Sequence, residues 1–117
     1  MTVEPCIVAA RAADAKLGED TTVLAMGELL GVTDAFVITS GRNPRHVRTI
    51  VEEVERRVKA ETGVSPLRIE GAADARWVLM DYGDFLVHVF LSEAREFYDL
   101  EHLWSAAPRV PWDGPAA

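Results

Sequence analysis

The sequence has one cysteine, no long apolar run and fewer basic than acidic residues, and each of these shortages excludes a class of protein. With Cys6 alone, the chain can form neither an internal disulfide nor a cysteine-cluster metal site, and we expect no cofactor. No stretch approaches the roughly 18 apolar residues that a membrane span requires. The first residues place an acid, Glu4, where a targeting peptide has a base, and no apolar segment follows. The sequence therefore predicts a cytoplasmic protein without a membrane partner.

Basic side chains are in the minority, because 12 Lys and Arg stand against 19 Asp and Glu, for a net charge of −7. This acidity repels a phosphate backbone and argues against DNA or RNA as the main partner. Between residues 70 and 101 there are eight acidic and two basic side chains, a local charge of −6. An acidic segment of this kind suits a basic protein partner. The alternative, which charge alone favours, is a solvated face that keeps the protein soluble.

The length of 117 residues accommodates one domain, and an apolar content of 49% is sufficient for a core. We assign residues 1–104 to this single domain. Residues 105–117 contain three prolines and one glycine, a composition that predicts a flexible C-terminal tail.

Hydrophobic periodicity divides the domain into helices and short strands. We predict helices over about 3–17, 44–62 and 93–104, and strands over about 21–26, 35–39, 67–70, 77–81 and 85–91. Thr2, Asn43 and Ser92 are suited to cap the helices, and glycines at 18 and 63 to end the first two. A strand, a crossover helix and the next strand predict parallel pairing at that point, and the hairpin adds antiparallel pairing. The fold class is therefore α/β, with a mixed sheet of about five strands flanked by helices.

The hairpin over residues 77–91 supports the most specific structural inference. We suppose that residues 82–83 form a two-residue turn. Asp81 then lies opposite Asp84, and Trp77 likewise lies opposite His88. Alternation places these four side chains on one face of the sheet, while the other face is purely aliphatic and aromatic and must be the core. The face outside the core comprises Trp77, Leu79, Asp81, Asp84, Leu86, His88 and Phe90.

This mixed face has two interpretations. Opposed like charges are unfavourable across a hairpin, so structure alone does not require the two aspartates. Aromatic and acidic groups together on a sheet surface are typical of an interface with a basic partner. The alternative is that helices cover the face and the aspartates merely flank the turn. The pattern favours neither interpretation.

The final helix carries a second set of candidate contacts. Arg95 and Tyr98 fall on one face, and Tyr98 is the best candidate there for an exposed aromatic contact. Helical spacing predicts that four other side chains pack inward. These are Phe97, Leu100, Leu103 and Trp104.

Three segments together resemble the ribosomal silencing factor (Iojap-like) family. Residues 77–90 read Trp-Val-Leu-Met-Asp-Tyr-Gly-Asp-Phe-Leu-Val-His-Val-Phe, and residues 95–104 read Arg-Glu-Phe-Tyr-Asp-Leu-Glu-His-Leu-Trp. Residues 34–41, Asp-Ala-Phe-Val-Ile-Thr-Ser-Gly, precede a valine-striped helix as in that family. The resemblance spans about residues 3–104, and two long motifs in the right order make it specific.

The resemblance implies a protein that acts by binding and catalyses no reaction. Members bind large-subunit ribosomal protein fourteen, sterically block joining of the ribosomal subunits and so repress translation, notably when nutrients are short. The implied fold is related to that of nucleotidyltransferases, and a role in large-subunit biogenesis is a further expectation. The matching positions that we expect to contact the partner are Trp77, Asp81, Tyr82, Asp84, His88, Arg95 and Tyr98. Trp77 and Tyr82 would be apolar anchors, and the aspartates would pair with bases of the partner. His88 is either a surface residue or a support for Trp77, and Arg95 either a contact or an internal brace of an aspartate.

Two other functions compete with this one. A metal-bound nucleotidyl transfer site could use Asp81 and Asp84, but the chain lacks an Asp-x-Asp pair on a following strand and a Walker loop. An RNA-binding module could use the small basic cluster at residues 42–48. We expect an ordinary helix surface there, with at most a minor contact with ribosomal RNA. The cluster consists of Arg42, Arg45, His46 and Arg48.

An exposed aromatic face is also a liability for a free monomer. We therefore predict a homodimer in isolation, which hides part of this face and opens on the ribosome.

Overall fold

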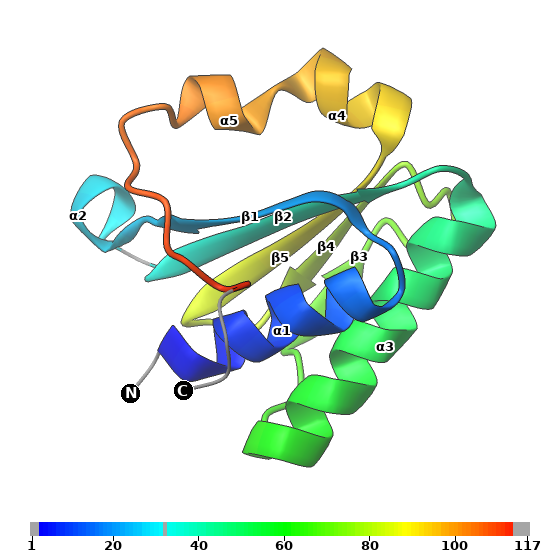
Figure 1. Ribbon diagram of the computed structural model, residues 1–117, viewed down its shortest axis with the longest axis horizontal. Coiled ribbons are helices and arrows are strands. Elements are labelled where there is room, and N and C mark those ends of the chain that lie inside the picture. Colours follow the sequence, from blue (N-terminus) through cyan, green and yellow to red (C-terminus); the bar gives the residue numbers. More distant parts are fainter. Residues whose placement is uncertain (1–2, 32, 114–117) are drawn as a thin grey trace.

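The computed structural model describes residues 3–31 and 33–113, which form a five-stranded mixed sheet between two layers of helices (Figure 1). The elements are α1 (Val3–Ala15), β1 (Glu19–Ala25), α2 (Gly27–Leu30), β2 (Ala35–Gly41), α3 (Pro44–Thr62), β3 (Arg68–Glu70), β4 (Trp77–Asp81), β5 (Phe85–Leu91), α4 (Ser92–Tyr98) and α5 (Leu100–Leu103). Helices α1 and α3 pack against each other under one face of the sheet, and α4 and α5 lie over the other face. The predicted fold class is confirmed.

The long helix α3 has the predicted bounds, and its ends show why. The Asn43 side chain accepts a hydrogen bond from the backbone N–H of His46 at 2.8 Å, which caps the first turn. Gly63 follows the helix with φ 78°, in the left-handed region that glycine adopts without steric cost. The apolar stripe of α3 is buried between the sheet and α1. No helix among the described residues is long and apolar enough to cross a membrane.

The end of α1 differs from the prediction, because Gly18 is not the residue in the left-handed conformation. The helix ends at Ala15, and Leu17 turns the chain with φ 63°. Gly18 is required for a close approach instead: a Cβ there would lie 2.5 Å from the Thr39 hydroxyl. The predicted cap, Thr2, lies outside the described residues.

The predicted parallel pairing exists, but it joins different strands. The sheet order is β1-β2-β5-β4-β3, and β2 pairs in parallel with β5 over its whole length, from Ala35 opposite Phe85 to Gly41 opposite Leu91. The strand that follows α3 directly, β3, lies at the edge of the sheet beside β4. All seven residues of β2 are buried, because helices cover both of its faces. The order of elements along the chain therefore predicted a parallel pairing of β2 across a helix, but it did not predict which strand pairs with β2.

The hairpin turn is shifted relative to the prediction. Leu79 lies opposite His88 and Asp81 opposite Leu86, and the backbone N–H of Tyr82 donates to the Phe85 carbonyl at 3.0 Å. The turn is therefore formed by residues 83–84, and the predicted opposition of two aspartates is wrong. Because the register moves by two residues, every side chain stays on its predicted face.

The final helix is broken into α4 and α5 at Asp99, which has φ 50°. This break rotates the two halves, so the predicted inward stripe is only half correct. Leu100 and Trp104 pack over the sheet, whereas Phe97 and Leu103 are exposed. The predicted capping role of Ser92 is also wrong, because its hydroxyl donates to the Gly41 carbonyl at 3.0 Å and ties α4 to β2.

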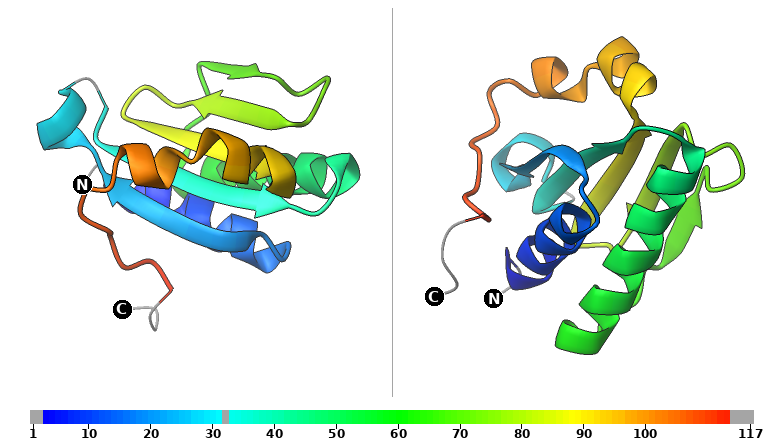
Figure 2. Two further views of the ribbon diagram at one scale, coloured as in Figure 1. Left: turned by 90° about the horizontal axis from the view of Figure 1, so that it is seen from above. Right: turned by 45° about the vertical axis from the view of Figure 1, so that its right-hand side comes forward.

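The segment after α5, for which a flexible tail is predicted, lies along β1 from Pro108 to Trp112 (Figure 2). The Ala25 N–H donates to the Pro108 carbonyl, and the Val110 N–H donates to the Val23 carbonyl, each at 2.8 Å. The Trp112 indole packs against the core beside α1, and its N–H donates to a β1 carbonyl at 3.1 Å. The segment therefore protects an edge strand that would otherwise be open. Residues 114–117 lie outside the described part.

Replacing Trp112 with alanine should lower the free energy of unfolding by about 2 kcal/mol, because the indole loses core packing and a hydrogen bond. Urea denaturation measures the effect. Trp112→Phe keeps most of the packing and should cost only about 1 kcal/mol. A Trp112→Ala variant that unfolds at the wild-type urea concentration would show that this segment is not held against β1.

Candidate protein-docking surface

The upper face of the sheet is only partly covered. Helices α4 and α5 run over β2 and β5, while β4 and β3 lie beside them without a helix above (left view of Figure 2). The open part carries Trp77 and Leu79 of β4 and Glu70 of β3. Trp77, Leu79 and Glu70 line a groove of about 310 Å³. The uncovered part of the sheet thus contains a mainly apolar groove beside α4.

Trp77 is held in one orientation by three contacts. Its ring stacks on Phe90 with centroids 5.0 Å apart, and the Tyr98 ring of α4 lies 4.6 Å away. Its indole N–H donates to Nδ1 of His88 at 3.0 Å. The tryptophan is therefore half-buried and preorganised, and its free edge continues into the groove.

Two aromatic side chains of α4 extend this surface outward. Phe97 is 80% exposed and Tyr98 is 44% exposed, and their rings meet edge to face at 5.2 Å. Tyr98 in turn contacts Trp77, so the four residues are continuous. We call Trp77, Leu79, Phe97 and Tyr98 the hairpin surface. Phe97 was absent from the predicted contacts because an unbroken helix would have turned it inward.

His88 is a support for Trp77, which is one of the two roles predicted for it. The side chain is 4% exposed, and the Phe36 ring lies edge-on at 4.6 Å. Because Nδ1 accepts the Trp77 N–H, the neutral ring carries its proton on Nε2, which has no partner among the described residues. Burial lowers the pKa of His88 from 6.5 to about 4, so the ring is neutral at physiological pH.

The residues of the turn have structural roles that the sequence did not reveal. Tyr82 is 6% exposed and its ring stacks on Phe85 in the main core, so little of its surface is available for the predicted role of an apolar anchor. Asp81 accepts the Gly83 N–H at 2.8 Å and forms an ion pair with Arg68 at 3.4 Å. Asp84 is exposed in the turn.

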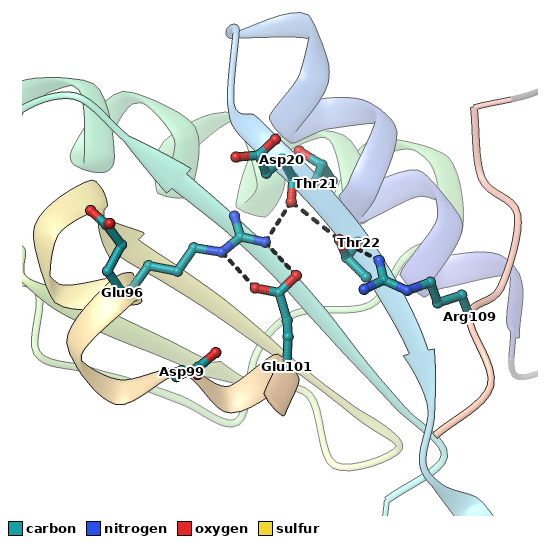
Figure 3. Close-up of a pocket in the computed structure, with 8 residues that line it drawn as sticks. Asp20, Thr21, Thr22, Glu96, Asp99, Glu101 and Arg109 are labelled. Carbon is teal, nitrogen blue, oxygen red and sulfur yellow. Dashed lines mark hydrogen bonds and ion pairs between the residues drawn. The ribbon is translucent and has the colours of Figure 1, made fainter. Parts of the chain in front are cut away.

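Arg95 is an internal brace, although its partners are not the predicted aspartates. Figure 3 shows two of the partners, Glu101 of α5 and Asp20 of β1. Its side chain is buried and forms an ion pair with Glu101 at 3.0 Å. The remaining donors reach the Glu19 and Asp20 carbonyls and the Ser40 hydroxyl, at 2.9, 2.6 and 3.1 Å. All five N–H groups are thereby used, so Arg95 anchors α4 to the start of β1 and has none left for a partner.

An α/β sheet with a preorganised aromatic surface next to carboxylates defines a candidate protein-binding module. Within the described ranges, no group of three or more side chains is arranged to hold a metal ion. The chain belongs to the ribosomal silencing factor family, because residues 2–117 match the family described as "Ribosomal silencing factor during starvation".

Individual relatives agree with this assignment. The chain is 40% identical over 106 residues to the ribosomal silencing factor of Bacillus subtilis, covering 91% of this chain and 89% of that protein. It is 39% identical over 107 residues to the factor of Halalkalibacterium halodurans, covering 92% and 91%. A crystal structure of a Chromobacterium violaceum protein superposes with a TM-score of 0.84 at 29% identity, covering 100% of this chain and 96% of the other. The relationship to nucleotidyltransferases stays a prediction.

The stability of the protein should fall between about pH 7 and pH 5 because of His88. Its pKa is lower in the folded state than in the unfolded state, so the unfolded chain binds more protons below pH 6.5 and stability is lost as pH falls towards about 4. The expected loss from His88 alone is about 2 kcal/mol. Urea denaturation at both pH values measures it, with the non-titrating His88→Asn variant as the reference. An NMR titration of the imidazole in the folded wild type with a midpoint near 6.5 would contradict the effect.

Proposed function

We propose that this chain binds large-subunit ribosomal protein fourteen through the hairpin surface and, by its bulk, prevents the two ribosomal subunits from joining. Translation is thereby repressed, notably when nutrients are limited. The observation on which this rests is an exposed, preorganised aromatic surface in a chain that belongs to the silencing-factor family. Trp77 packs on the sheet, but Phe97 contributes little to the fold of the monomer, since it is 80% exposed and meets Tyr98 edge to face.

The physical properties of the hairpin surface suit a basic protein partner. Trp77 and Tyr98 are already oriented, so binding loses little side-chain entropy and the aromatic area converts efficiently into affinity. Carboxylates flank the surface, with Glu70 at the groove and Glu93 and Glu96 exposed on α4. Acidic groups at the rim of an interface attract a basic partner and orient it. Asp84, which is exposed in the turn, would pair with a base of the partner, whereas Asp81 is engaged within the fold.

In this proposal the protein acts in the cytoplasm by occupying a surface, not by catalysing a reaction. The competing nucleotidyl transfer site needs two carboxylates that converge on one metal ion. Asp81 instead supports the turn and pairs with Arg68, and Asp84 does not lie opposite it.

A second role, in assembly of the large subunit, is favoured by one relative. The mouse protein named "Mitochondrial assembly of ribosomal large subunit protein 1" is 34% identical over 88 residues, which cover 74% of this chain and 39% of that protein. Binding to the same large-subunit protein before assembly is complete would use the same surface.

Binding should depend strongly on the hairpin surface. Trp77→Ala should weaken the affinity for isolated ribosomal protein fourteen about thirtyfold, and Phe97→Ala about tenfold, because each removes an aromatic anchor. Calorimetry measures the affinities, and the large exposure of Phe97 makes its variant safe for folding.

Two controls make this result specific. Leu17→Ala removes an equally exposed apolar side chain at the end of α1, in the other layer, and should leave the affinity unchanged. Tyr82→Phe removes a buried hydroxyl that has no hydrogen-bond partner within residues 3–31 and 33–113, and it should also be neutral. If Trp77→Ala and Phe97→Ala both bind with the wild-type affinity, this surface is not the binding site. Failure of the wild type to bind whole large subunits, or to inhibit subunit joining in a sedimentation assay, would exclude the function.

In the absence of the ribosome we expect the protein to form a homodimer through the hairpin surface, because exposed apolar groups favour self-association. Light scattering at micromolar concentration should give twice the monomer mass for the wild type and the monomer mass for Phe97→Ala. Addition of the ribosomal protein should dissociate the dimer. A wild type that remains monomeric throughout this range would rule the dimer out.

A further inference from the structure

Four exposed arginines gather at one end of the sheet, at the border of the hairpin surface. They are Arg42, Arg45, Arg48 and Arg76. The end of β5 brings two of them together. The Leu91 N–H donates to the Arg76 carbonyl at 2.8 Å on one side of β5. On the other side Leu91 pairs with Gly41, the residue before Arg42. Arg42 and Arg76 therefore leave the sheet on either side of one strand.

The other two arginines lie near the start of helix α3, at the same end of the sheet. Arg45 and Arg48 lie in its first two turns, and the Arg48 guanidinium donates to the Ala73 carbonyl at 2.8 Å, in the loop that leads to Arg76. The amino-terminal end of a helix as long as α3 adds partial positive charge at the same place. The loop, the helix start and the sheet edge thus form one basic patch.

None of the four has a carboxylate within 4.0 Å in the described ranges, although the chain is strongly acidic. Nearby acids exist, since Asp74 lies in the same loop and Glu52 lies one turn after Arg48, yet neither forms an ion pair with them. Of the six other arginines, all within the described part, four have a carboxylate partner: Arg56, Arg57, Arg68 and Arg95. The remaining two, Arg11 and Arg109, donate instead to the Trp112 carbonyl and the Thr22 hydroxyl. The basic patch is therefore not used to neutralise the protein's own charge.

We propose that this basic patch, comprising Arg42, Arg45, Arg48 and Arg76, binds the phosphate backbone of ribosomal RNA beside the bound ribosomal protein. The inference rests on the proposed function, because it requires the hairpin surface to dock on a large subunit. Arg76 directly precedes Trp77, so a partner seated on the hairpin surface brings its neighbouring RNA to the patch. Planar guanidinium groups pair bidentately with phosphate, and such contacts orient a complex without reading sequence.

The patch differs from the basic cluster predicted from the sequence. His46 does not belong to it, because the ring is buried and both nitrogens are engaged, with the Arg42 N–H at 2.9 Å and the Lys16 carbonyl at 2.8 Å. Arg76, which is distant along the chain, joins it through the sheet. The patch is consequently a tertiary feature and not a property of the helix alone.

The test compares two charge-matched variants of the full chain on purified large subunits at several salt concentrations. Arg42→Gln with Arg45→Gln removes two charges from the patch, and Arg56→Gln with Arg57→Gln removes two charges from the far half of α3. Each phosphate contact releases counterions, and its loss makes binding less dependent on salt. The magnitude of the slope of log affinity against log salt concentration should therefore fall by roughly 1.5 in the first double variant, and its affinity should fall about tenfold. The second should leave both at the wild-type values.

Three results would overturn the proposal, and they are distinguishable. An unchanged salt slope in the Arg42/Arg45 variant, with Trp77→Ala still weakening binding, rejects the RNA contact and leaves the proposed function intact. An equal loss of affinity for isolated ribosomal protein fourteen, without RNA present, assigns the arginines to a protein contact. Failure of the wild type to bind large subunits removes the proposed function and this inference together.

Discussion

The pairing of β2 with β5 is the constraint on which the rest of the structure depends. It is the one parallel ladder among the described strands, and it joins segments separated by α3, β3 and β4. Its strands lie in the middle of the sheet, so helices must cover both faces, and every residue of β2 is buried. The same ladder sets Gly41 beside Leu91 and so brings the start of α3, the loop before β4 and the start of α4 to one end of the molecule.

The hairpin surface is stiffened from beneath and from the side. His88 accepts the Trp77 N–H from inside the sheet, and a neutral ring is needed for this because a protonated Nδ1 could not accept it. Arg95 of α4 donates to two carbonyls of β1 and to the Ser40 hydroxyl of β2, and it forms an ion pair with Glu101 of α5, which fixes the helix that carries Phe97 and Tyr98. The two buried polar residues thus hold Trp77 and α4 in place. Their burial explains how side chains within a recognisable motif can be important for binding and yet be inaccessible.

Charge on this small acidic protein is distributed in a way that suits a composite partner. Carboxylates flank the aromatic surface, whereas unpaired arginines stand at one end of the same sheet. A ribosomal subunit presents basic protein and RNA phosphate side by side. A factor that contacts both needs acidic groups facing the protein and, next to them, basic groups facing the phosphate. The negative net charge of the chain, taken alone, predicts only the contact with a basic protein.

The sequence by itself determined what depends on neighbours along the chain. Asn43 and Gly63 set the ends of α3 through local backbone chemistry, and alternation assigned every hairpin residue to its correct face. The resemblance carried by two motifs identified the family. Only the tertiary structure decided the hairpin register, because a shift of two residues preserves the faces and is invisible to alternation, and the stacking of Tyr82 on Phe85 accompanies the shifted turn. Long-range contacts likewise decided the break at Asp99, the burial of Arg95 and the docking of residues 105–113 on β1, since each depends on groups far away in the sequence.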